Sequence, residues 1–321
     1  MPRKDTPSQQ PTRRIPKKQQ TVLESNNTER SGLVISQYGQ SLEIETNHAE
    51  LRRCKQRKNL GAIVPGDRVR FTGEDNNNSV IVAVEPRQSL LARPDNRGRA
   101  KAIAANLDRI FIVTAIKPEL NEGLIDRYLV AAEALGITPV IVLNKMDLAD
   151  ADTRQVLQAR MRIYEQLGYA VIYTSAQSEH GLDDLLAALK SHASILVGQS
   201  GVGKSSLVNA LLPEVDAEVA AISDATGKGM HTTSASRLYH LPNGGDLIDS
   251  PGVREFGLWE VSPEELAEGF IEFRPYLGRC KYSDCQHESE SECAIKAAMA
   301  EGKISPQRFD SYRRILASLA D

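Results

Sequence analysis

Hydrophobic and polar positions alternate over short distances in the first part of the chain. Short segments with β-branched residues are separated by turn-forming Gly, Pro, Asp and Asn, at 32–36, 41–45, 67–71 and 79–84. This spacing is typical of short strands joined by turns. About five strands in so short a stretch predict a small closed β-barrel of the OB type.

The pattern changes further along, where continuous apolar runs are separated by helical stretches. The apolar runs lie at 109–114, 139–143, 170–173, 195–197 and 246–248. The helical stretches cover 124–135, 152–167 and 182–190, and Gly136 and Gly168 end the first two. Unbroken apolar strands that alternate with helices predict a parallel sheet buried on both faces, and therefore an α/β domain.

The C-terminal part is predicted to be helical. Ser262 followed by Pro263 and Glu265 provides a Ser cap, a Pro in the first turn and a Glu at the third position, which together mark a helix start. A last helix begins at Ser305-Pro306 and has an apolar face made by Phe309, Tyr312, Ile315, Leu316 and Leu319. We therefore expect a multidomain α/β protein with a basic arm at 1–30, a barrel at 31–88, a basic linker at 89–105, an α/β domain at 106–260 and a helical domain at 261–321.

The net charge of −3 conceals a strongly basic N-terminal arm. Residues 1–30 carry seven Lys and Arg against three acidic residues and almost no large apolar side chain, so this segment cannot bury enough surface to fold alone. It is predicted to be a disordered contact for a polyanion, RNA or DNA before a membrane surface, with a solubilising tail as the alternative. A second basic stretch, Arg52–Lys58, suits a nucleic-acid face of the barrel, with a solvated loop as the alternative.

Targeting signals and cysteine usage favour the cytoplasm. No apolar run approaches the ~20 residues that span a bilayer, and the charged N-terminus lacks the apolar core of a secretory signal. Three of the four cysteines crowd together beside a histidine, which favours metal ligation over disulfides. We expect a cytoplasmic monomer with no membrane contact.

A phosphate-binding loop follows the strand expected at 195–197. It matches G-x-x-x-x-G-K-[ST] and opens a helix that we expect to reach Leu211. Its residues are Gly198, Gln199, Ser200, Gly201, Val202, Gly203, Lys204 and Ser205. Backbone N–H groups and the helix N-terminus can surround a β-phosphate. Lys204 is expected to bridge the β- and γ-phosphates, and the Ser205 hydroxyl is expected to bind Mg²⁺.

A second phosphate-contacting sequence, Asp249-Ser250-Pro251-Gly252, ends the strand at 246–248. Asp249 can hold Mg²⁺ through water, and the Gly252 N–H can meet a γ-phosphate. The string D-x-x-G is common in ordinary turns, but its position after a strand and after the phosphate loop favours the functional interpretation.

The glycine-rich segment 227–233 between these two motifs is predicted to be a switch. Thr232 or Thr233 can complete the coordination of Mg²⁺ when the nucleotide orders it. Val253 stands where many GTPases have a Gln that orients the attacking water, and an apolar side chain cannot do this. His231 is our candidate for that role, and an exposed loop histidine without a catalytic part is the alternative.

The tetrapeptide Asn144, Lys145, Met146 and Asp147 ends another strand and suits guanine. The Asp147 carboxylate can accept hydrogen bonds from guanine N1–H and the 2-amino group, whereas adenine presents an acceptor at N1 and would leave the charge unpaired. Asn144 can brace the loop, and the Lys145 stem can lie along the base. The strand after it ends at Thr174, Ser175 and Ala176, where a backbone N–H can donate to guanine O6.

The C-terminal Cys/His cluster provides a complete set of metal ligands. Cys280, Cys285, His287 and Cys293 offer three thiolates and one imidazole. This set fills a tetrahedral site with no open position, so a zinc ion held there would be structural. Buried free cysteines near a surface histidine are the alternative, and Cys54 is most simply a core thiol.

The guanine motif precedes the phosphate loop, which is the reverse of the usual order, and this indicates a circularly permuted chain. With the Cys/His spacing, this order resembles the circularly permuted GTPases of bacterial ribosome assembly, the RsgA family of small-subunit biogenesis GTPases. The resemblance covers nearly the whole chain. It places zinc on the four cluster residues, extends the phosphate site to Ser206 and associates His231 with catalysis. Gly227–Met230 depart from the Arg-containing switches common in that family.

The resemblance implies hydrolysis of GTP to GDP and phosphate, stimulated by the small ribosomal subunit. It also implies binding of 16S rRNA late in 30S maturation, with Mg²⁺ and one zinc ion as cofactors. An RNA-binding assembly scaffold with very slow GTP turnover is an alternative, which Val253 favours slightly. A kinase or ATPase that shares only the phosphate loop is a second alternative, and Asp147 argues against it.

Overall fold

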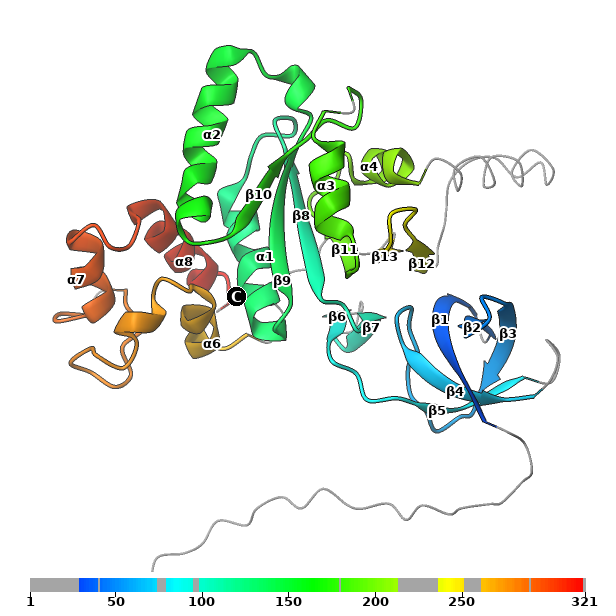
Figure 1. The fold of residues 1–321 in the computed structure, drawn as a ribbon. Coiled ribbons are helices and arrows are strands. Elements are labelled where there is room, and N and C mark those ends of the chain that lie inside the picture. Colours follow the sequence, from blue (N-terminus) through cyan, green and yellow to red (C-terminus); the bar gives the residue numbers. More distant parts are fainter. Residues whose placement is uncertain are drawn as a thin grey trace, which may run out of the picture.

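The chain folds into three parts that meet at a central α/β domain (Figure 1). The barrel and the small helical domain lie on opposite sides of it. The computed structural model describes residues 29–39, 41–73, 79–94, 98–178, 180–212, 236–250, 261–288 and 290–319. None of the helices within these ranges combines the length and apolar character needed to cross a membrane.

Five short strands close the N-terminal barrel. They are β1 (Arg30–Tyr38), β2 (Ser41–Thr46), β3 (Leu51–Gln56), β4 (Arg68–Thr72) and β5 (Val80–Val84). β1 pairs with both β2 and β4, while β3 joins β2 to β5, so hydrogen bonding runs around the barrel. Alternate side chains point inward, among them Val34, Ile44, Phe71 and Ile81. The basic stretch predicted at Arg52–Lys58 includes most of β3, whose Cys54 is buried.

The stretch expected as a basic linker at 89–105 contains a hairpin of β6 (Leu90–Pro94) and β7 (Ala100–Ala105). Its inner residues Leu91, Ile103 and Ala104 are buried in the core of the α/β domain. Burial of these apolar side chains holds the hairpin against the sheet, so the path from barrel to α/β domain is a packed element.

The α/β sheet has the strand order β10-β9-β8-β11-β13-β12. The strands are β8 (Arg109–Ala115), β9 (Thr138–Asn144), β10 (Ala170–Tyr173), β11 (Ala193–Val197), β12 (Arg237–His240) and β13 (Asp246–Asp249). All neighbours are parallel except β12, which is antiparallel to β13. The predicted continuous apolar strands are therefore found where expected, and they form the parallel part of the sheet.

Helices cover both faces of this sheet (Figure 1). α1 (Glu122–Leu135) and α2 (Ala151–Gln166) pack on one face, and α3 (Leu182–Leu189) and α4 (Lys204–Leu211) pack on the other. A 3₁₀ turn, η1 (Met146–Leu148), follows β9. Gly136 ends α1 in the left-handed conformation, as its position in the sequence predicts.

The C-terminal domain packs against α1. It consists of α6 (Pro263–Gly269), η3 (Arg274–Tyr276), α7 (Ala294–Ala300) and α8 (Pro306–Ala317). The predicted capping box at Ser262 and Glu265 is present. Gly269 lies so close to α1 that a Cβ there would stand 2.5 Å from Val130 Cγ1. A side chain at this position would therefore push α6 away from the α/β domain.

A buried ion cluster also joins these two domains. Arg308 of α8, which is 2% exposed, donates from Nε to Glu272 Oε1 at 2.7 Å and from Nη1 to Asp126 of α1. Its guanidinium lies 4.3 Å from the ring centroid of Phe270, and the Tyr164 hydroxyl of α2 donates to Asp126 at 2.9 Å. Charges removed from water to this degree are tolerated only when each has a partner.

An Arg308→Ala variant is expected to lose about 3–5 kcal/mol of stability, because Asp126 and Glu272 would remain buried without their cation. The measurement is chemical denaturation followed by circular dichroism. Arg313→Ala removes an exposed arginine of the same helix and is expected to change stability by less than about 0.5 kcal/mol. Equal losses in the two variants would contradict a structural role for the cluster.

Candidate nucleotide site and metal centre

The phosphate loop lies between β11 and α4, as predicted, and its glycines permit its shape. Gly198 and Gly203 adopt φ of +139° and +95°. A Cβ on Gly198 would lie 2.1 Å from the Val113 carbonyl oxygen, and one on Gly203 would lie 2.4 Å from Asn144 Nδ2. Side chains at these two positions would collide with the neighbouring strand ends, so glycine is needed for the loop to approach them.

The guanine motif and the phosphate loop are in direct contact, although the sequence separates them widely. Asn144 is buried, and its Nδ2 donates to the Val202 carbonyl at 2.9 Å. Its Oδ1 accepts from the Ala176 N–H at 3.3 Å. The Lys145 ammonium donates to the Gly201 carbonyl at 2.5 Å. Asn144 therefore ties three predicted loops into one site.

Asp147 is held in place by the loop at 174–176. The buried Ser175 hydroxyl donates to Asp147 Oδ1 at 2.5 Å. The loop of Ser175 is itself closed by His180, whose carbonyl accepts from the Ser175 N–H and from the Thr174 hydroxyl, each at 2.9 Å. Asp147 remains exposed. The Asp147 carboxylate is therefore fixed through Oδ1, while the side chain as a whole faces solvent.

Asp249 and Lys204 share the phosphate side of the site. Burial raises the pKa of Asp249 above its usual range, while the Ser250 N–H and the charge of Lys204 oppose that rise. The Lys204 ammonium donates to the carbonyls of Gly198 and Gln199 at 2.6 and 2.8 Å. Ser205, in the first turn of α4, is exposed. A cation near Asp249 and Ser205 would favour the charged form of the carboxylate.

The Cys/His cluster has the dimensions of a tetrahedral metal site. Nδ1 of His287 lies 3.5, 3.4 and 3.4 Å from Sγ of Cys280, Cys285 and Cys293, and Sγ of Cys280 lies 3.9 Å from that of Cys293. Around tetrahedral zinc, bonds of ~2.3 Å to sulfur and ~2.1 Å to nitrogen put a nitrogen and a sulfur ligand roughly 3.6 Å apart, and two sulfur ligands roughly 3.8 Å apart. The four residues therefore fit a zinc ion.

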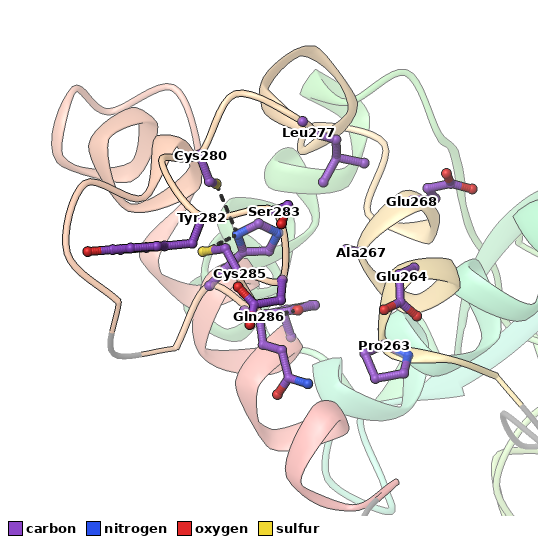
Figure 2. Close-up of a pocket in the computed structure, with 14 residues that line it drawn as sticks. Pro263, Glu264, Ala267, Glu268, Leu277, Cys280, Tyr282, Ser283, Cys285 and Gln286 are labelled. Carbon is purple, nitrogen blue, oxygen red and sulfur yellow. Dashed lines mark hydrogen bonds between the residues drawn. The ribbon is translucent and has the colours of Figure 1, made fainter. Parts of the chain in front are cut away.

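The local backbone aims these ligands at one point. Figure 2 shows Cys280 and Cys285 turned toward the same imidazole ring. The contacts of both sulfurs with Nδ1 of His287 identify that ring. His287 has a left-handed φ of +65°, and Cys293 caps the N-terminus of α7. Burial lowers the pKa of His287, which keeps the imidazole neutral and able to bind a metal. The cluster also forms one wall of a cavity of about 240 Å³, whose opposite wall is α6 with Glu264 and Glu268.

Comparison with known proteins identifies the family. A family model described as RsgA GTPase matches residues 84–259, which is more than half of the chain. The chain belongs to the RsgA GTPase family. Among curated relatives, the small ribosomal subunit biogenesis GTPase RsgA of Dickeya dadantii is 51% identical, with 90% of this chain and 84% of that protein covered. The protein of the same name from Azotobacter vinelandii is 52% identical, with 91% and 87% covered.

Solved structures of two related proteins share the fold. YjeQ from Thermotoga maritima is 34% identical with a TM-score of 0.76, and the match covers 91% of this chain and 99% of that one. YloQ, a circularly permuted GTPase, is 28% identical with a TM-score of 0.74, and the match covers 94% and 98%. The permuted order inferred from the motifs is therefore that of the RsgA fold.

Some predicted site residues lie outside the part of the chain that the structure describes. They are His231, Thr232, Thr233 and Gly252. Two further contacts in the described part involve residues outside the predicted motifs. The Lys145 ammonium also donates to the Lys117 carbonyl at 2.7 Å, and the Ser236 hydroxyl donates to that of Ser250 at 2.6 Å. Lys117 and Ser236 belong to no motif, so the sequence offered no signal for these two contacts.

Proposed function

We propose that this member of the RsgA family hydrolyses GTP to GDP and phosphate in late 30S maturation, is stimulated by the small ribosomal subunit, and binds 16S rRNA. The observation that carries the proposal is Asn144, which joins the guanine motif, the phosphate loop and the loop of Ala176 through two hydrogen bonds. A site built this way recognises the base and the phosphates of one nucleotide. Action as a cytoplasmic monomer is part of the same proposal.

In this proposal each group of residues has a separate task. Asp147 reads guanine, supported by the backbone of residues 174–176, and residues 198–206 surround the phosphates. Lys204 offsets charge that develops on the transferred phosphoryl group. Ser205, Asp249, and Thr232 or Thr233 hold Mg²⁺, which neutralises phosphate charge when bound. Gly252 donates its N–H to the γ-phosphate, and His231 orients the attacking water.

A zinc ion held by Cys280, Cys285, His287 and Cys293 has a structural task. All four positions of a tetrahedron are taken by protein ligands, so no site remains for water or substrate. The four residues bring together two separate turns of a domain that packs on α1. Zinc therefore stabilises the C-terminal domain and takes no part in hydrolysis.

The RNA partner is supported by charge. The arm at 1–30 is basic, and on β3 Arg53 and Lys55 are exposed on either side of buried Cys54. Alternation along the strand therefore presents cations on the outer face of the barrel. Such a surface favours phosphate contacts, which would weaken as salt is added.

The test is phosphate release from GTP and from ATP, each with and without purified small ribosomal subunits. Large subunits serve as the control for ribosomal RNA in general. Slow, GTP-specific turnover that rises steeply with small subunits alone is the expected result. Turnover unaffected by small subunits would remove the stimulating partner, and equal use of ATP would remove the guanine assignment.

A Lys204→Ala variant is expected to lower GTP hydrolysis by about 10²–10³-fold, because one preorganised positive group at the phosphates is lost. Single-turnover hydrolysis with subunits present measures this. Lys190→Ala, which removes an exposed lysine at the end of α3, is the matched control and is expected to retain full activity. A scaffold that holds GTP without turnover predicts intact subunit maturation in the Lys204→Ala variant, and that outcome would favour the alternative.

A further inference from the structure

One residue of β12 stands between the barrel and the carboxylate expected to hold Mg²⁺. β12 pairs with β1 on one side and with β13 on the other, so the two domains share one 11-stranded sheet. Arg237 faces Ser36 of β1 as its Cα partner, and in the other direction it faces Asp249 of β13. Ser36, Arg237 and Asp249 therefore form a row across three adjacent strands.

The side chain of Arg237 is bound to the barrel. Its Nη1 lies 3.1 Å from Glu43 Oε2 of β2 and donates to the Tyr38 hydroxyl of β1 at 3.0 Å. The same Glu43 oxygen accepts from the Ser36 hydroxyl at 3.2 Å. Ser36 is fully buried, and the Glu43 side chain is 15% exposed. Because its two partners lie on two paired strands of the barrel, the guanidinium joins β12 to both β1 and β2.

The residues beside Arg237 extend this connection toward the phosphate side of the site. Ser236 precedes Arg237, and its hydroxyl donates to the Ser250 hydroxyl at 2.6 Å. Ser250 directly follows Asp249. A displacement of the start of β12 would therefore move the Asp249 backbone through two routes, the strand pairing and the hydroxyl pair.

The far end of β12 is bound in the same way. His240 contacts Glu45 Oε2 of β2 at 2.8 Å through Nε2, and Asp246 Oδ1 of β13 at 2.6 Å through Nδ1. β12 has only four residues, so side chains at both ends fasten it to the barrel and to β13 at once. A hollow of about 510 Å³ opens beside Ser236, the residue before β12, and is also lined by Tyr38 and Lys101 among others. A partner bound to the barrel can thus reach the contact between β12 and the barrel.

We propose that Arg237 is a positioning residue for GTP hydrolysis, which holds β12 to the barrel and thereby sets the position of Asp249. Binding of the small subunit at the barrel is transmitted to the Mg²⁺ carboxylate through this row of residues. The inference rests on the proposed function, since it explains how that partner stimulates hydrolysis. Displacement of a catalytic group by about 1 Å is enough to change a rate by about 10²-fold.

The test compares Arg237→Gln with Arg162→Gln, a control that removes an exposed arginine of α2. In Arg237→Gln we expect the stimulation by subunits to fall about tenfold, while binding to the subunit is retained. The Mg²⁺ concentration needed for tight binding of a fluorescent GTP analogue is expected to rise about tenfold. Amide hydrogen exchange at 246–249 is expected to accelerate. Arg237→Lys, which keeps a cation for Glu43, should restore most of each value.

A second variant breaks the same contact from the barrel side and leaves β12 unchanged. Glu43→Gln removes the partner carboxylate from the barrel side and is expected to show the same losses. The double variant should be no worse than either single variant if the two residues act through one contact. This comparison keeps the proposal testable even if Arg237→Gln folds poorly.

The failure of this inference is distinct from the failure of the proposed function. A wild-type chain that does not respond to subunits would refute the stimulating partner, and the Mg²⁺ requirement for analogue binding would still test Arg237. If subunits stimulate the wild-type chain and both Arg237→Gln and Glu43→Gln keep the wild-type stimulation, Mg²⁺ requirement and exchange rates, the positioning role is wrong.

Discussion

A Cys293→Ser variant is expected to lose the zinc ion of the C-terminal domain and, with it, most of the stability of that domain. Structural zinc contributes an apparent binding free energy of about 10–16 kcal/mol in small metal domains, which is as large as the whole stability of a typical domain. Cys293 is 4% exposed and belongs to the same core as Phe270 and Phe273. Loss of the metal therefore also loosens the packing around the cysteine.

The measurement combines metal content by mass spectrometry with near-ultraviolet circular dichroism, which reports on the packed ring of Tyr312 beside Phe273. A chelator added to the wild-type protein should reproduce the variant, and added zinc should reverse the change. Cys54→Ala is the matched control, because that thiol is equally buried but lies in the barrel. Stoichiometric zinc in Cys293→Ser, or an unchanged spectrum after the metal is removed, would contradict a structural zinc site.

The α/β domain could be predicted from sequence because its signals are local. An apolar run followed by a helical stretch predicts each strand and helix, and α1 and α4 end where the sequence indicated, at Leu135 and Leu211. The phosphate loop is likewise contiguous, so its place between β11 and α4 followed from its own residues. The capping box at Ser262 is a third local signal of this kind.

The arrangement between domains could not be predicted, because it depends on contacts between distant residues. Ser36 and Arg237 pair although most of the α/β domain lies between them in the sequence, and a mostly polar four-residue strand gives no sign of its partner. The hairpin at 90–105 reads as a basic connector because its exposed positions are charged. Its structure is decided by Leu91, Ile103 and Ala104, which are buried only once the sheet has formed.

Within the site, too, local motifs could be predicted and contacts between distant residues could not. The motif at 144–147 indicated guanine, but the hydroxyl that fixes Asp147 comes from Ser175, which the sequence suggested only for its backbone. Nothing in the sequence distinguishes Arg308 from the other arginines of the last helix. Its partner Asp126 lies in another domain, so burial of the pair became visible only in the structure.

An Asp147→Asn variant is expected to change the base preference from guanine to xanthine. Guanine presents two donors, N1–H and the 2-amino group, which a carboxylate can accept together. An asparagine presents one acceptor and one donor, which matches the N1–H and the 2-oxo group of xanthine. A site built to hydrogen-bond one base rejects an analogue with mismatched donors and acceptors by about 10⁴-fold, so the ratio of kcat/KM for GTP over XTP should fall by about that factor.

Ser175 makes this test specific for a fixed carboxylate. Its hydroxyl holds Asp147 Oδ1 at 2.5 Å, so Ser175→Ala should weaken GTP use by about tenfold, the effect of one lost charge-assisted hydrogen bond, without creating XTP use. Asp152→Asn, an exposed carboxylate at the start of α2, is the control for charge and should leave both values unchanged. If Asp147→Asn retains its preference for GTP, base recognition must lie elsewhere, and the permuted order of the motifs would no longer argue for a guanine nucleotide. If XTP use appears while hydrolysis still responds to subunits, recognition of the base and response to the partner are separate properties of the same site.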